Sequence, residues 1–126
     1  METRIISEGI VQIAVTTSEL TPGSVAVLDE LNDVATKYIT EGYRKFVLDL
    51  SAVDHIDSFG LARLLRIIRP LYNQSGEATI VATGSVGRVF EVAGFSQLMK
   101  VFPTFESARD YMQSRPPDNR DETAGK

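Results

Sequence analysis

The chain has 126 residues, enough for one ordinary domain, and its 43% hydrophobic and 24% charged residues can build a buried core. It has no cysteine and one histidine, which excludes disulfides, thiolate catalysis and Cys- or multi-His-ligated metal sites. The net charge of −4 at pH 7 argues against nucleic acid as the main partner.

The charge is unevenly distributed along the chain. Residues 1–57 carry four basic and ten acidic side chains, whereas residues 58–114 carry six basic and four acidic ones. This step is either a feature that a protein partner recognises or an ordinary mixed surface. The N-terminus lacks a basic, apolar signal sequence, and no run of about 18 apolar residues occurs. We therefore expect a soluble cytoplasmic protein without a membrane partner.

The first half of the chain predicts two strands, a helix and a third strand. Strands are expected at 4–7 and 9–16, with a turn at Glu8–Gly9, a helix from Pro22 to about Thr40, and a strand at 45–50. Thr21 can cap the helix and Pro22 suits its first position, where the missing N–H costs nothing. The strand at 45–50 is nearly continuous in apolar residues, which is typical of a strand covered on both faces.

The second half alternates helices and strands. We expect a helix at 58–73, a strand at 78–82, a short helix capped by Ser85 and ended by Gly94, a strand at 100–102, and a last helix capped by Thr104. Residues 115–126 contain two prolines and no large apolar side chain, so we expect a disordered tail after a domain of residues 1–114. This order predicts an α/β fold with a mixed sheet.

The densest functional signal is the segment from Val47 to Leu61, where a buried strand, a short loop and a helix start follow one another. Asp57 or Ser58 can cap that helix by accepting a bond from an N–H of its first turn. Gly60, without a side chain, allows another backbone to approach closely. Ser58 is either a plain cap or a phosphoacceptor. A phosphate would add about −1.5 to −2 charges, which a helix N-terminus tolerates but a docked protein would not.

The helix from residue 58 also predicts a docking surface. With its leucines facing inward, Ser58, Ala62 and Arg66 share the outer stripe, and Phe59 and Arg63 flank it. Aromatic residues and arginine are enriched at interfaces. The alternative is that Phe59 enters the core and the arginines are simply solvated.

Other chemical interpretations of these residues fail. Asp54, His55 and Asp57 offer too few ligands for a metal site. The same His and Asp beside Ser58 do not make a hydrolase triad, because no nucleophile elbow surrounds Ser58. The glycine-rich segment 84–88 lacks the lysine and length of a phosphate-binding loop. We therefore expect no metal, no cofactor and no enzyme activity.

The segment Asp49-Leu50-Ser51-Ala52-Val53-Asp54-His55-Ile56-Asp57-Ser58-Phe59-Gly60-Leu61 resembles the STAS family, the sulfate-transporter and anti-sigma-factor-antagonist domain. The later segments Val92-Ala93-Gly94-Phe95 and 102–108 also fit, so the resemblance covers about residues 5–114. It implies a STAS-like fold, with a four- to five-stranded mixed β-sheet packed with about four α-helices. The chain departs from the family at Phe59, where a second serine is usual, and at Thr16–Leu20, where Glu19 takes the place of the family's aspartate.

The resemblance also implies partner switching. Such a protein, when unphosphorylated, binds an anti-sigma factor that is also a serine kinase, and phosphorylation, here at Ser58, releases it. A PPM-type phosphatase restores binding, and ATP and Mg²⁺ belong to the kinase. The expected partner surface comprises Asp57, Ser58, Phe59, Ala62, Arg63 and Arg66. The alternative is a non-catalytic scaffold or accessory subunit, in a stressosome or beside a transporter; homodimer formation is left open.

Overall fold

The computed structural model describes residues 1–94 and 99–114, so the expected tail at 115–126 and Phe95 lie outside the described residues. The elements are β1 (Glu2–Ile6), β2 (Ile10–Ala14), β3 (Glu19–Leu20), α1 (Val25–Thr40), β4 (Lys45–Asp49), β5 (His55–Ile56), α2 (Ser58–Asn73), β6 (Glu77–Val81), α3 (Gly84–Val92), β7 (Lys100–Phe102) and α4 (Phe105–Ser114). Short 3₁₀ turns at Ser7–Gly9 and Pro22–Ser24 precede β2 and α1.

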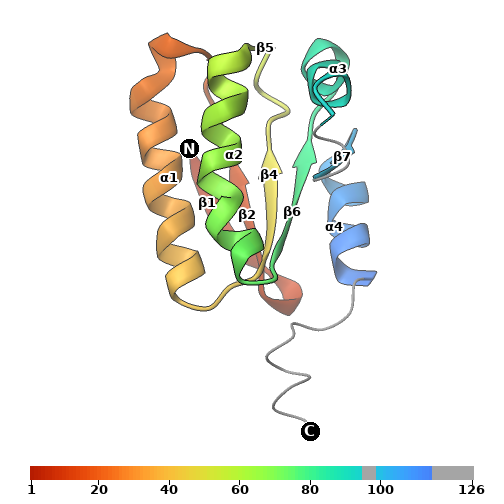
Figure 1. Cartoon of the computed structure of the whole chain (residues 1–126). Coiled ribbons are helices and arrows are strands. Elements are labelled where there is room, and N and C mark those ends of the chain that lie inside the picture. The colour runs from red at the N-terminus through yellow and green to blue at the C-terminus, as the bar shows by residue number, and fades with distance from the viewer. Residues whose placement is uncertain (95–98, 115–126) are drawn as a thin grey trace, which may run out of the picture.

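Five strands form one mixed sheet in the order β1-β2-β4-β6-β7 (Figure 1). β1 and β2 form an antiparallel hairpin, and every other neighbouring pair in this sheet is parallel. Together with the four helices, this arrangement confirms the predicted α/β fold with a four- to five-stranded mixed sheet. The central strand is β4, as the continuous apolar run at 45–50 predicts.

Helices cover both faces of β4. Phe46 and Leu48 pack in the main core with the buried leucines of α1 and α2, which lie side by side over one face of the sheet (Figure 1). Val47 points the other way and packs with Ala108 and Met112 of α4. Successive residues of a strand face opposite sides of a sheet, so β4 requires apolar residues at consecutive positions.

Thr21 caps the turn that leads into α1, as the sequence predicts. The Thr21 side chain accepts a hydrogen bond from the Gly23 N–H, and the Ser24 side chain accepts one from the Thr21 N–H, which completes a capping box around Pro22. One 3₁₀ turn then leads into α1 at Val25. Among the described residues, no helix combines the length and apolarity needed to cross a membrane.

Besides shifted element ends, such as β1 at Glu2–Ile6 and β2 at Ile10–Ala14 where strands at 4–7 and 9–16 are predicted, two local details near the start of α2 and α3 differ from the sequence prediction. The two-residue strands β3 and β5 pair in parallel as a second small sheet, which the sequence analysis missed. Ser85 does not cap α3: the helix begins at Gly84, and its N-cap residue, Thr83, makes no side-chain capping bond. The Ser85 hydroxyl instead donates to the Asp54 carbonyl at 3.5 Å. Gly84 has a φ of 59°, so glycine allows the chain to turn into the helix one residue earlier.

Candidate functional site

The start of α2 is built around Asp57. Asp57 is the N-cap residue, with extended backbone, and its side chain accepts a hydrogen bond of 3.1 Å from the Gly60 N–H. The sequence left open whether Asp57 or Ser58 caps the helix, and the structure assigns this role to Asp57. Ser58 is therefore the first residue inside the helix.

The Ser58 hydroxyl is available for chemistry. Ser58 is exposed, and no hydrogen-bond partner for its side chain is found in the described part of the chain. The hydroxyl lies at the N-terminus of a 16-residue helix, where backbone N–H groups and the helix dipole favour negative charge. An anionic group attached to Ser58 therefore meets a favourable local field and displaces no existing contact.

Gly60 and the small sheet hold this helix start in place. A β-carbon on Gly60 would collide with the carbonyl oxygen of Leu20, in β3. The same carbonyl accepts a hydrogen bond of 3.4 Å from the Asp57 N–H, while β3 pairs with β5 directly before it. This confirms that Gly60 admits a close backbone approach, and it identifies the neighbour as the 16–20 segment.

Of the six residues expected at a partner surface, Asp57 is the N-cap residue of α2 and the other five lie on two sides of the helix. Ser58, Ala62 and Arg66 are exposed along the outer stripe. Phe59 and Arg63 are half-buried, and Phe59 packs in part against the core. The sequence analysis left open whether Phe59 points outward or inward, and both interpretations hold in part.

Arg63 is held against α1. Its guanidinium forms an ion pair of 2.6 Å with Asp29 and lies 6.0 Å from the centre of the Phe59 ring. Phe59, Arg63 and Asp29 thus form one cluster on the side of α2 that faces α1. Because the Arg63 charge is already paired with Asp29, the guanidinium is not freely available to a partner.

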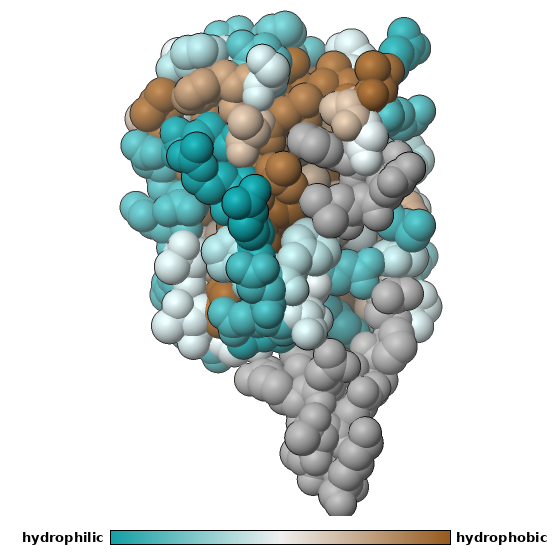
Figure 2. All heavy atoms as spheres, viewed as in Figure 1, coloured by the Kyte–Doolittle hydropathy of each residue, from teal (hydrophilic) through white to brown (hydrophobic). Residues whose placement is uncertain are grey.

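On its other side, the start of α2 borders an apolar groove of about 500 Å³. The lining residues come from β5, α2 and α3: Ile56, Asp57, Ser58, Leu61, Ser85, Arg88, Val89, Val92 and Ala93. In Figure 2, apolar surface runs between the upper end of α2 and α3 on the viewed face. The sequence analysis missed this groove, although it contained one signal: Val92 falls outside the inward face of the helix. In the structure, the Val92 side chain is 80% exposed.

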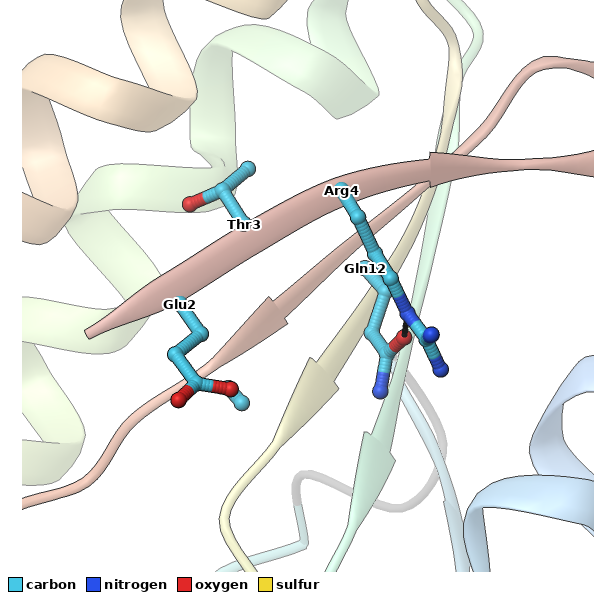
Figure 3. Close-up of a pocket in the computed structure, with 5 residues that line it drawn as sticks. Glu2, Thr3, Arg4 and Gln12 are labelled. Carbon is cyan, nitrogen blue, oxygen red and sulfur yellow. Dashed lines mark hydrogen bonds between the residues drawn. The ribbon is translucent and has the colours of Figure 1, made fainter.

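The structure also shows where the residues considered as metal ligands lie, and it contains a second cavity away from the start of α2. Asp54 and His55 are exposed, and no group of three metal-ligating side chains occurs among the described residues. A separate cavity of about 300 Å³ lies at the β1 edge, where the Arg4 Nε–H donates to the Gln12 Oε1 at 2.5 Å (Figure 3). It contains none of the predicted site residues.

Known proteins resemble this chain in sequence and in fold. A protein of Thermotoga neapolitana described as a candidate anti-sigma factor antagonist is 29% identical over 83 residues, which are 65% of this chain and 74% of that protein. The anti-sigma-B factor antagonist of Staphylococcus aureus is 31% identical over 78 residues, 61% of this chain and 72% of that protein.

Among solved structures, the anti-sigma factor antagonist SpoIIAA in its unphosphorylated form matches with a TM-score of 0.70 at 17% identity, covering 90% of this chain and 98% of that one. The phosphorylated form of this Bacillus protein matches with a TM-score of 0.67 at 20% identity, covering 87% of this chain and 96% of that one. These likenesses show the shared fold. Residues 11–108 match the model of the STAS domain, and the chain therefore belongs to the STAS domain family.

Proposed function

We propose that this protein is an anti-sigma-factor antagonist that works by partner switching. Unphosphorylated, it binds an anti-sigma factor that is also a serine kinase; phosphorylation of Ser58 ends the binding, and a PPM-type serine phosphatase restores it. The proposal places the chain in the cytoplasm and gives it no catalytic step of its own. The names of its relatives support the general role. The observation that carries the mechanism is the exposed Ser58 hydroxyl, which has no hydrogen-bond partner among residues 1–94 and 99–114 and lies beside the cap residue Asp57.

The modification is a phosphoryl transfer between two proteins. The Ser58 Oγ attacks the γ-phosphorus of ATP bound to the kinase, its proton passes to a base of the kinase, and ADP leaves. ATP and Mg²⁺ belong to the kinase. The product carries about −1.5 to −2 charges at neutral pH. Since the helix N-terminus accommodates that charge, its effect falls on the docked partner through repulsion and desolvation.

The partner surface surrounds Ser58 on α2. We propose that Asp57 orients the helix start and that Ala62 and Arg66 contact the partner along the exposed stripe. Phe59 and Arg63 complete this surface from the side that faces α1. Arg63 contributes through its position over Phe59, because its charge is already paired with Asp29.

The test begins with co-purification from the native cell, with Ser58→Ala and Ser58→Asp chains as baits. We expect Ser58→Ala to retain a kinase of the anti-sigma type and Ser58→Asp to lose it. Calorimetry with the purified kinase then measures the loss, which we expect to exceed tenfold in Kd. Mass spectrometry should find phosphate on Ser58 of the wild-type chain.

A matched control adds the same charge nearby. Ser51 is exposed in the loop after β4, and Ser51→Asp should bind the kinase as the wild type does. If Ser58→Asp binds as tightly as wild type, the switch is wrong. Capture of a transporter subunit or of a large STAS scaffold, with no phosphate on Ser58, would instead support the non-catalytic accessory role.

A further inference from the structure

We propose that the groove between α2 and α3 is the specificity pocket of the partner interface. In this proposal, which rests on the proposed function, the groove receives an apolar side chain of the anti-sigma factor, and Arg88 on its rim pairs with a carboxylate beside that side chain. A phosphate on Ser58 then competes for Arg88 at the mouth of the same groove. The partner surface thus extends from α2 to α3, although none of the residues expected from the sequence lies on α3.

The shape and lining of the groove fit an apolar side chain. Ile56 and Leu61 are only 3% and 8% exposed and line the groove together with Val89. Val92, at 80% exposure, is the most exposed of the large hydrophobic side chains in the described residues. Covering such a surface removes apolar area from water, which favours binding by a complementary side chain. The volume of about 500 Å³ accommodates a large aliphatic or aromatic group.

The charge around the groove indicates the chemistry beside that side chain. Two charged residues line it, Asp57 and Arg88. The Asp57 carboxylate already accepts the Gly60 N–H. Arg88 is exposed and has no ion-pair partner within residues 1–94 and 99–114, in contrast to Arg63, which is bound to Asp29. The free charge at the rim is therefore positive, and it is complementary to a carboxylate of the partner.

This arrangement links the groove to the switch. Ser58 lines the same groove as Arg88, so a phosphate on Ser58 introduces a strong anion at its mouth. Arginine pairs with phosphate through two parallel hydrogen bonds, an interaction stronger than its pairing with water. The phosphate thus withdraws Arg88 from the partner's carboxylate and adds a hydrated group where the apolar side chain enters. Both effects release the partner without a change of fold.

The experiment measures binding of the purified anti-sigma factor kinase by calorimetry to two groove variants and two controls. Val92→Ser removes apolar contact without adding charge, and Val25→Ser is its control, because Val25 is an exposed valine of α1 at 40% exposure. Arg88→Gln removes the rim charge, and Arg109→Gln removes an arginine charge on α4. We expect Kd to rise roughly tenfold for Val92→Ser and about threefold or more for Arg88→Gln, with both controls unchanged.

A double-mutant cycle tests the competition for Arg88. If the negative charge introduced at position 58 acts partly by taking Arg88 from the partner, Ser58→Asp must weaken binding by a smaller factor in the Arg88→Gln background than in wild type. Equal factors in the two backgrounds would overturn the coupling. Circular dichroism confirms that each variant is folded before its binding is compared.

The outcomes separate this inference from the function on which it rests. Loss of binding in Ser58→Asp, together with wild-type affinity in Val92→Ser and Arg88→Gln, overturns the groove and leaves the switch intact. A wild-type chain that binds no anti-sigma factor overturns both. Sedimentation that shows wild-type dimers and Val92→Ser monomers would assign the groove to a second copy of this chain and overturn the inference.

Discussion

The carbonyl oxygen of Leu20 occupies the space that a side chain on Gly60 would need. A β-carbon built on Gly60 falls far inside contact distance of that oxygen and also touches the Ile56 side chain. The obstacle is backbone, held by the β3–β5 pairing, so it cannot rotate away as a side chain could. The glycine after Phe59 is therefore required by the packing of α2 against β3.

Gly60→Ala is accordingly expected to lower the free energy of unfolding by about 2–3 kcal/mol, because β3 or the start of α2 must shift. Gly23→Ala is the control, since a β-carbon there meets only the Thr21 hydroxyl at an ordinary 3.6 Å. Urea denaturation followed by circular dichroism gives both values. Equal stability of the two variants would contradict the close approach of Leu20 to Gly60.

Loss of the cap at Asp57 is expected to cost about 1 kcal/mol of stability. Asp57→Ala leaves the Gly60 N–H without its acceptor, whereas Asp57→Asn keeps a side-chain oxygen in place. Asp54→Ala serves as the control, because Asp54 is an exposed residue of the preceding loop. If Asp57→Ala unfolds at the same urea concentration as Asp54→Ala, Asp57 is not the cap.

Ser58→Asp is expected to leave the fold intact or to stabilise it by about 0.3–1 kcal/mol, because a carboxylate at the first helical position meets the positive end of the helix dipole. The stabilisation should shrink as salt is added, since exposed charges are screened. Thermal unfolding at low and high salt measures it. A strong destabilisation would mean that any loss of partner binding in this variant reflects unfolding and not repulsion.

The environment of Tyr72 predicts that the free energy of unfolding falls at alkaline pH. Burial raises the pKa of the Tyr72 hydroxyl, the hydrogen bond that its oxygen accepts from the Ala78 N–H lowers it, and the nearby Glu77 and Tyr111 raise it. The folded state thus holds this proton more tightly than the unfolded state does. The contribution of this proton to the free energy of unfolding is complete below the ordinary tyrosine pKa of about 10. It is lost as the pH rises from there through the raised pKa of Tyr72 in the folded state.

Tyr72→Phe has no phenol to titrate at this position. Between about pH 9 and 11, its free energy of unfolding should therefore fall less steeply than that of wild type. Urea denaturation across that range measures both slopes. Parallel slopes would show that Tyr72 titrates equally in the folded and unfolded states.

The sequence predicted the elements whose signals are local and strong. The helix at 58–73 agrees with α2 at both ends, because the Asp57 cap and the 3.6-residue spacing of its leucines act within the helix itself. The strand at 45–50 lies at the centre of the sheet, since its apolar residues are consecutive. The strands predicted at 4–7 and 9–16 are instead Glu2–Ile6 and Ile10–Ala14, because strand ends depend on the partner strand.

The parts that the sequence did not predict depend on tertiary contacts. β3 and β5 have two residues each, too few for any period, and they exist because they pair with each other. Serine is a preferred N-cap residue, but the Ser85 hydroxyl donates instead to the nearby Asp54 carbonyl. The apolar groove joins residues of α2 and α3 that are about 30 positions apart, so its existence follows only from the packing of the two helices.

The pairing of β3 with β5 has a mechanical consequence. The segment after β2 and the segment before α2 are joined by the pairing of Leu20 with Ile56 and by the hydrogen bond from the Asp57 N–H to the Leu20 carbonyl, so a displacement of one segment strains its contacts with the other. A change in the length or sequence of Thr16–Leu20 would thus tilt the first turn of α2. It would change the orientation of Ser58 without a substitution at position 58. The position of the Ser58 side chain therefore depends on a segment that lies about 40 residues earlier in the sequence.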